Sequence, residues 1–298
     1  MSEPMNIVSP WTLRVKSGEQ PSCSDLQEHL AAIHDNNAGF TESCAWNCRD
    51  SKGKNSYDLL ADVVDPERHS RVLDLACGSG VLLELCHKRF GSELALLGSD
   101  MSEAELRLAR NRLDHTDIEF HHGMAQDLRF IADASIDVIL CHWALTLMDP
   151  VAPVFANSKR VLTGNGIFAA IIDGDEKTAP GYREIHDIIY TYARHDYPQY
   201  GFIELGDQRV RTSAALMELA AQSFTGANIK ITPIVLTMKA KPDVLARETA
   251  GFFYASFVLS VNDHRKMLID LERHFATYLQ DEDSCFKMPV NLLTITQK

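Results

Sequence analysis

Short apolar runs alternate with amphipathic stretches in the middle of the chain. Each run has the length of a strand and is bounded by turn residues, so each predicts a buried strand. The five runs span residues 71–76, 94–99, 118–121, 136–140 and 166–172. Helices are expected over 102–113, where Ser102 and Glu105 make a capping-box pattern, and over 151–162. Strands that alternate with helices pair in parallel through right-handed crossovers, so we expect an open α/β sheet.

The segments outside these elements follow looser patterns. Residues 1–56 are mixed and polar, and we expect them to form an N-terminal arm or lid before a main domain over 57–298. Further predicted helices span 25–34, 57–64, 181–194, 213–224 and one or two stretches of 242–280, and further strands span 229–238 and 290–296. We expect the insert 176–206 and the helical cap 242–280 to cover a substrate pocket.

The composition narrows the function classes. The chain has 298 residues, with 29 Lys and Arg against 41 Asp and Glu, and this net charge of −12 argues against a protein that tracks nucleic-acid phosphates. No stretch approaches the roughly 20 apolar residues of a membrane helix, and the start lacks a secretory signal pattern. Seven cysteines, an odd count, indicate a reducing compartment. We expect a cytoplasmic protein with a small-molecule substrate, without nucleic-acid or membrane partners, and a possible homodimer.

Acidic and glycine residues gather where the first two strands end. Asp74 ends the first strand, and Gly78 and Gly80 follow it in a turn that lets the backbone approach a ligand closely. Asp100 ends the second strand, 20 residues after Gly80, where an acidic residue is placed to bind ribose hydroxyls. A carboxylate there would repel a 2′-phosphate. The pattern therefore predicts a site for an unphosphorylated nucleoside.

The nature of this nucleoside depends on the residues around the turn. A dinucleotide-binding fingerprint requires a third glycine at the position of Leu83. A pyrophosphate also favours a helix N-terminus without a nearby acid, whereas Asp74 suits a ligand that carries an ammonium group. These features favour S-adenosylmethionine over NAD, and an NAD-type oxidoreductase is the alternative.

Several stretches resemble the motifs of class I S-adenosylmethionine-dependent methyltransferases of the small-molecule type. Residues 71–80 resemble their motif I. Residues 98–103, 122–128 and 136–145 resemble their second, third and fourth motifs. Residues 161–168 resemble the hairpin that enters their fifth strand, and residues 290–296 resemble their last strand. The resemblance covers residues 57–168 and, more loosely, residue 229 to the end. It implies an open seven-stranded, mostly parallel sheet with helices on both faces, an antiparallel last strand, and a helical lid inserted between the last strands.

The resemblance also implies which residues bind the cofactor. It places Asp100 on the ribose, Met101 beside the adenine, Ala125 and Gln126 at the adenine edge, and Cys141 behind the methionine moiety. The full set is Asp74, Ala76, Gly78, Gly80, Asp100, Met101, Ala125, Gln126 and Cys141. Two positions depart from the family pattern: Ala76 stands where many members have glycine, and Gln126 stands where an acid is frequent. Asp127 is therefore an alternative adenine ligand.

The implied reaction is an in-line transfer of the sulfonium methyl group to a small metabolite, by O-, N- or C-methylation. The protein then mainly aligns the reactants, although a hydroxyl or carbon acid also needs a general base. His142 follows the fourth strand and is the candidate base, because imidazole titrates near neutrality. Packing beside Trp143 is its alternative role. A non-catalytic cofactor-binding subunit is the alternative to an enzyme.

Candidate substrate residues lie further along the chain. Tyr182, His186, Tyr190 and Arg194 recur every four residues, which places them on one broad helical stripe. The stripe could line a substrate pocket, with Arg194 holding a carboxylate, or simply pack or face solvent. Tyr57 and Trp46 are candidates for residues that reach over the cofactor. We expect no metal. A site built from His142, His186 and His195 would instead indicate metal-assisted C-methylation of an α-keto acid.

Overall fold

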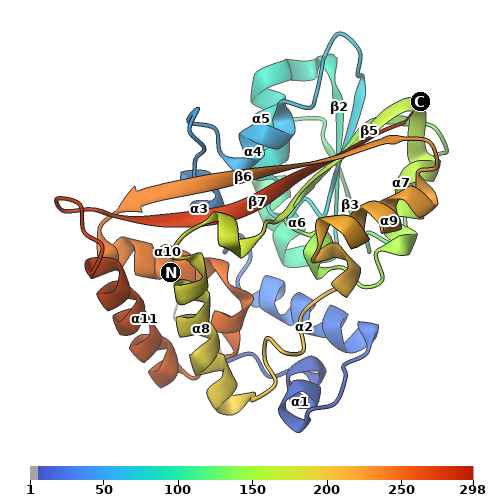
Figure 1. The fold of residues 1–298 in the computed structure, drawn as a ribbon. Helices are drawn as coiled ribbons and strands as arrows, with labels where there is room; N and C mark the ends of the chain where they lie inside the picture. Colours follow the sequence, from blue (N-terminus) through green and yellow to red (C-terminus); the bar gives the residue numbers. More distant parts are fainter. Residues whose placement is uncertain (1–5, 298) are drawn as a thin grey trace. The chain divides into compact units, whose positions relative to one another are not determined.

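Seven strands form one sheet in the computed structural model, which describes residues 6–297 (Figure 1). The strands are β1 Arg71–Leu75, β2 Ala95–Asp100, β3 Glu119–His122, β4 Ile136–His142, β5 Leu162–Asp173, β6 Asn228–Ala240 and β7 Ser284–Thr296. Their order is β3-β2-β1-β4-β5-β7-β6. Strands β1 to β5 pair in parallel, and β7 runs antiparallel to β5. The predicted open, mostly parallel sheet with an antiparallel last strand is confirmed.

Helices cover both faces of the parallel part of the sheet. They are α4 Ser56–Ala61, α5 Val81–Phe90, α6 Glu103–Arg112, α7 Ala152–Val161 and α9 Ser213–Ser223. Neighbouring strand residues point to opposite faces. In β2, Leu97 belongs to a buried cluster with residues of α7 and α9, whereas a side chain at Gly98 would meet Leu83 of α5. The predicted cap of α6 forms, since the Glu105 N–H donates to Ser102 Oγ over 3.2 Å.

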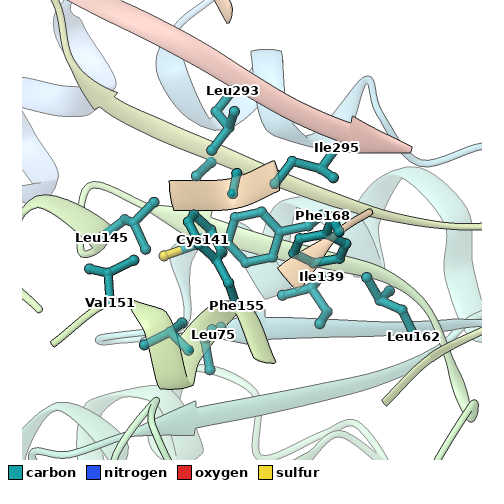
Figure 2. Close-up of a cluster of buried hydrophobic side chains, with 14 of the residues drawn as sticks. Leu75, Ile139, Cys141, Leu145, Val151, Phe155, Leu162, Phe168, Leu293 and Ile295 are labelled. Carbon is teal, nitrogen blue, oxygen red and sulfur yellow. The ribbon is translucent and has the colours of Figure 1, made fainter. Parts of the chain in front are cut away.

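A hydrophobic core lies between the sheet and helices α7 and α9, and it accounts in part for the continuous apolar runs that predicted the strands. Its buried residues include Leu75, Ile139, Phe155, Phe168 and Leu293, which Figure 2 shows together. Phe155 of α7 and Phe168 of β5 meet edge to face with ring centroids 5.5 Å apart. Parallel strands that are covered on both faces need apolar residues throughout, which is why the sequence shows runs instead of alternation.

The start of β5 differs from the predicted hairpin. The strand begins at Leu162, opposite Ile136 of β4, but the next pair joins Val138 to Ile167. Between these two pairs the chain moves on by two residues in β4 but by five in β5, so residues 163–166 form a bulge that is not paired with β4. The segment is one irregular strand.

Two units emerge from the contacts within the chain. The sheet unit comprises residues 56–173, 205–234 and 290 to the end, and the helical unit comprises the remaining residues up to 289. The helical unit therefore collects the predicted arm, the insert and the cap, together with parts of β6 and β7. Whether these segments act as a lid stays a prediction.

The helical unit contains α1 Pro10–Ser17, α2 Cys23–Asn36, α3 Glu42–Asn47, α8 Tyr182–Asp196, α10 Pro242–Phe252 and α11 Val261–Ala276. Helix α11 packs against both α8 and α10 (Figure 1). Helices α1 and α3 are additions to the predicted elements, although Ser9 caps α1 and Pro10 is its first residue. Within residues 6–297, every helix is too short or too polar to cross a bilayer.

Candidate functional site

The carboxyl ends of β1 to β5 bring most of the predicted site residues to one edge of the sheet. Parallel strands end on the same side, and ligands of open α/β sheets bind there. Asp74 lies one residue before the end of β1, and the last residues of β2, β4 and β5 are Asp100, His142 and Asp173. This edge is therefore the candidate site, and it lies within the sheet unit.

Asp74 is a buried carboxylate whose two oxygens both lack a hydrogen-bond partner. Asp74 is only 1% exposed to solvent. Burial, and then the nearby Asp100, raise the pKa of Asp74 well above its usual range. An unpaired buried carboxylate is costly unless a ligand satisfies it. The ammonium group of the predicted cofactor has the charge and the donors to do so, so the residue fits this group.

The turn after β1 has the backbone that its glycines predict. Gly78 and Gly80 have φ angles of 50° and 81°, in the left-handed region. A side chain at Gly80 would place its Cβ 3.0 Å from Ala109 Cβ, so the turn packs closely on α6. Ala76 also lies in this region, with φ at 59°. A glycine, which many family members have at this position, would adopt this conformation without the steric cost that alanine has.

Asp100 ties the ends of β1 and β2 together. Its Oδ2 accepts the N–H of Gly78 and its Oδ1 accepts the N–H of Ser102, each over 2.8 Å. These two bonds fix the carboxylate between the ends of the two strands. Met101, the next residue, is held through its carbonyl oxygen, which lies 2.9 Å from Nε2 of His122. The predicted ribose and adenine contacts of these residues stay predictions.

The geometry favours Gln126 over Asp127 as the adenine ligand. Gln126 Oε1 is a buried acceptor without a partner, while its Nε2 donates weakly to the Pro150 carbonyl over 3.4 Å. Asp127 instead receives two hydrogen bonds from Arg129 Nε, and these bonds lower the pKa of Asp127 to about 2. An unfilled buried acceptor suits an exocyclic amino group. Ala125 packs against the core cluster beside it.

Cys141 lies inside the hydrophobic core. Figure 2 shows its sulfur on the side of Leu145 and Val151, and the residue has no exposed surface. Burial raises the pKa of the thiol to about 12, so it remains protonated and unreactive at neutral pH. Its predicted place behind the methionine moiety stays a prediction.

His142 is held by residues from the start of α4. Its Nε2 lies 2.9 Å from Ser56 Oγ, and its ring stacks on Tyr57 with centroids 4.0 Å apart. Trp143 meets the same ring edge to face at 5.2 Å. Burial lowers the pKa of His142 to about 3, which keeps the imidazole neutral at neutral pH. The ring thus packs beside Trp143, which is the alternative role expected from the sequence. It is also unprotonated, as a general base must be before it acts.

Sequence reasoning missed Asp173, the partner of Trp143, and Arg211, the partner of Asp173. Trp143 Nε1 donates to Asp173 Oδ1 over 3.2 Å, and Arg211 donates to Asp173 Oδ2 over 3.0 Å. One signal was available, because Asp173 follows the same rule as Asp74 and Asp100: it is an acid at the carboxyl end of a parallel strand.

The predicted stripe on α8 forms within the helical unit and packs against aromatic rings. Tyr182 lies near the rings of Phe253 and Phe286, at 5.8 and 6.1 Å. His186 stacks on Tyr190 at 3.8 Å. The guanidinium of Arg194 lies 4.8 Å from the Phe202 ring, and its Nε donates to the Tyr200 carbonyl. A substrate role for Tyr182, His186 and Arg194 stays a prediction, as does that of Tyr57.

Metal-binding side chains do not gather in the described part of the chain. Among residues 6–297, no group of three or more His, Cys, Asp or Glu residues is arranged to hold a metal ion. His195 is largely exposed and lies beside Asp263, with 3.6 Å between His195 Nδ1 and Asp263 Oδ2.

Comparisons with known proteins agree with the fold and the motifs. The family model described as a methyltransferase domain matches residues 72–166, which contain β1 to β4 and the start of β5. A demethylmenaquinone methyltransferase from Listeria monocytogenes is 24% identical over 164 residues, which cover 51% of this chain and 68% of the relative. A "2-phytyl-1,4-naphtoquinone methyltransferase" from Synechococcus elongatus is 34% identical over 122 residues, 40% of this chain and 52% of the relative.

Solved structures extend the similarity in fold to most of the chain. A protein from an antibiotic biosynthesis pathway of Anabaena variabilis has a TM-score of 0.61 at 13% identity, and the match covers 84% of this chain and 98% of that one. A Haemonchus contortus phosphoethanolamine-type N-methyltransferase, solved with phosphomonomethylethanolamine and S-adenosylhomocysteine, has a TM-score of 0.54 at 16% identity, covering 91% of this chain and 60% of that one. At such identities the likeness concerns the fold.

Proposed function

The chain is a class I S-adenosylmethionine-dependent methyltransferase, and we propose that it methylates a hydroxylated aromatic ring of the quinol type. The cofactor, when bound, supplies a methyl group activated by its sulfonium. The observation that carries the proposal is the position of the unprotonated His142, which ends β4 beside the end of β1 that holds Asp74. A hydroxylated ring becomes a good nucleophile when its hydroxyl loses a proton, so this acceptor needs a base, whereas a neutral amine needs none.

The names of two relatives support this acceptor class. The Listeria protein is named for demethylmenaquinone and the Synechococcus protein for a naphthoquinone, both of which are quinone-type rings. Their reduced, quinol forms carry the hydroxyl groups that a base would act on. The methyltransferase family model matches residues 72–166, which hold most of the candidate site.

The cofactor would be held by residues that the structure leaves ready for it. Asp74 has two unpaired carboxylate oxygens for the ammonium group, and Gln126 has an unpaired acceptor for the adenine amino group. Asp100 is fixed at the end of β2 by the backbone N–H groups of Gly78 and Ser102, and its carboxylate would accept the ribose hydroxyls. These residues bind and orient the cofactor, while His142 takes up the hydroxyl proton of the acceptor.

A panel of acceptors tests the proposal. The full chain is incubated with methyl-labelled S-adenosylmethionine and, separately, with a reduced 2-alkyl-1,4-naphthoquinone, a simple phenol, an aromatic amine and an α-keto acid. We expect label in the naphthoquinol product, and its position on carbon or oxygen follows from mass fragmentation. The oxidised naphthoquinone is the matched control, because it lacks the hydroxyl proton and should take no label. Labelling of the amine alone would refute the proposal, and labelling of the keto acid would favour the metal-assisted alternative.

A further inference from the structure

Trp143, the residue after His142, has an unusual backbone. Its φ angle is 56°, in the left-handed region that bulky side chains rarely adopt. Such a conformation persists only where the surroundings hold it in place, and it concentrates at functional sites. The Trp143 N–H donates to the Ile171 carbonyl of β5 over 3.0 Å, which fixes one end of the turn.

The side chain of Trp143 is fixed by a carboxylate at the end of β5. Its indole N–H donates to Asp173 Oδ1, and Arg211 donates to the other carboxylate oxygen, Oδ2. Both oxygens of Asp173 are thus engaged in one arrangement. Rotation of this carboxylate would weaken both bonds together.

Arg211 extends the contacts to the rest of the turn. Besides Asp173, it donates to the carbonyl oxygens of Thr146 over 3.3 Å and Leu205 over 2.5 Å. Gly206 packs against the same place, since a Cβ there would lie 2.1 Å from the Thr146 carbonyl oxygen. The turn after β4 is therefore fixed by hydrogen bonds at Trp143 and again at Thr146. Ser56 and Tyr57 contact His142, the residue that precedes this turn.

We propose that Asp173 is a positioning residue, which acts with Arg211 through the Trp143 turn to set the orientation of the His142 imidazole. The inference rests on the proposed function, in which His142 takes up the acceptor proton. The ion pair is substantially exposed, with 41% of the Asp173 side chain and 28% of the Arg211 side chain open to solvent. Exposed ion pairs add little to stability. Loss of Asp173 should therefore affect the rate much more than the melting temperature.

The sheet unit offers a closely matched control. Arg160 also donates to one carboxylate, that of Asp133, and to two backbone carbonyls, those of Ile131 and Leu128. Asp133 lies three residues before the start of β4, at the opposite end of that strand from His142, and Arg160 lies in α7. Asp133→Ala removes the same kind of ion pair as Asp173→Ala without touching the candidate site.

The test combines kinetics with the naphthoquinol and a spectroscopic signal. We expect Asp173→Ala to lower kcat by roughly tenfold, with KM for S-adenosylmethionine nearly unchanged, because a misplaced base slows the transfer but leaves cofactor binding intact. Asp173→Asn keeps an oxygen for the indole N–H and should restore most of the rate. The indole N–H resonance of Trp143, assigned with Trp143→Phe, should move in Asp173→Ala and stay in Asp133→Ala. The latter variant should keep the wild-type kcat.

A double variant separates this inference from the proposed function. If Asp173 acts through His142, then His142→Gln combined with Asp173→Ala should lose no more rate than His142→Gln alone. Additive losses, or a wild-type kcat in Asp173→Ala, would overturn the positioning role while His142 remains the base. If His142→Gln itself keeps the wild-type rate, the proposed base fails, and the positioning role fails with it.

Discussion

Each of the two units holds a histidine in the same local arrangement. In the sheet unit, His142 lies within hydrogen-bond distance of Ser56, and in the helical unit, Nδ1 of His29 lies 3.0 Å from Ser9 Oγ. Each ring also stacks on an aromatic neighbour. Burial lowers the pKa of both imidazoles, to about 3 for His142 and about 4 for His29. A serine partner, a stacked ring and a low pKa therefore do not identify a reactive histidine.

The position in the fold separates the two. His142 ends a parallel strand beside β1, which holds Asp74 near its own end, and an α/β sheet binds its ligands at this edge. His29 lies in the middle of α2, has no exposed surface, and leaves its Nε2 without a partner. Local chemistry thus indicates what a side chain can do, and the topology indicates whether a substrate can reach it.

The largest expected effect comes from exchanging each histidine for glutamine. His142→Gln should lower kcat with the naphthoquinol by about 100-fold or more, because a general base typically contributes this much. His29→Gln should lower the melting temperature and leave kcat unchanged. Initial rates and thermal melts of both variants provide the comparison. Equal losses of kcat would show that the position in the fold does not separate the two residues.

A second large effect is expected at Asp74. Asp74→Asn should weaken S-adenosylmethionine binding by about 100-fold, because it removes a charged partner from a buried pair. The free protein should become more stable, since a neutral amide replaces a buried carboxylate without partners. Calorimetric titration gives the affinity, and denaturant unfolding gives the stability. Ser284→Ala is the control from the helical unit, because it removes another buried polar atom without a partner. An unchanged affinity in Asp74→Asn would exclude Asp74 from the cofactor site.

The dependence of stability on pH tests the helical histidine. The folded state holds the pKa of His29 at about 4, whereas an unfolded histidine titrates near 6.5, so the unfolded chain binds the proton more tightly. The stabilising effect of the neutral ring is complete above pH 6.5 and is lost as pH falls towards 4. At pH 5 the loss is about 2 kcal/mol for this one group. Urea unfolding at several pH values should show a shallower acid slope in His29→Gln, and an unchanged slope would mean that His29 is not held neutral.

The sheet could be predicted because its signals are local. Strands covered on both faces appear as apolar runs, and candidate cofactor residues such as Asp74 and Asp100 stand at the ends of these runs at fixed spacing. The helical unit has no such repeat. Helices α1 and α3 have 8 and 6 residues, too few to show a clear apolar period, and were missed. The register jump at the start of β5 was missed as well, because it depends on how β4 and β5 pair.

The contacts around Trp143 show a second limit on what the sequence reveals. Asp173 lies 30 residues after Trp143, and Arg211 lies 38 residues after Asp173. Only the folded chain brings the three together. The positive φ of Trp143 is also invisible in the sequence, since glycine is the residue expected there. The residues at the strand ends could thus be placed from their motifs, while the contacts that hold the turn after His142 could not.

The smallest effect on stability is expected in the turn after β1, where Ala76 has a φ angle of 59°. Ala76→Gly removes the steric cost of a Cβ in this conformation but adds backbone freedom to the unfolded chain, so the net gain in stability should be at most about 1 kcal/mol. Ala134→Gly is the control, because Ala134 has a φ angle of 48° in the exposed turn before β4. The substitution removes the same steric cost at a position away from the carboxyl ends of the strands. Both glycine variants should shift the unfolding midpoint alike and bind S-adenosylmethionine as the unchanged chain does. A loss of affinity confined to Ala76→Gly would instead assign the Ala76 methyl group a contact with the cofactor, and would extend the site from charged residues to this apolar one.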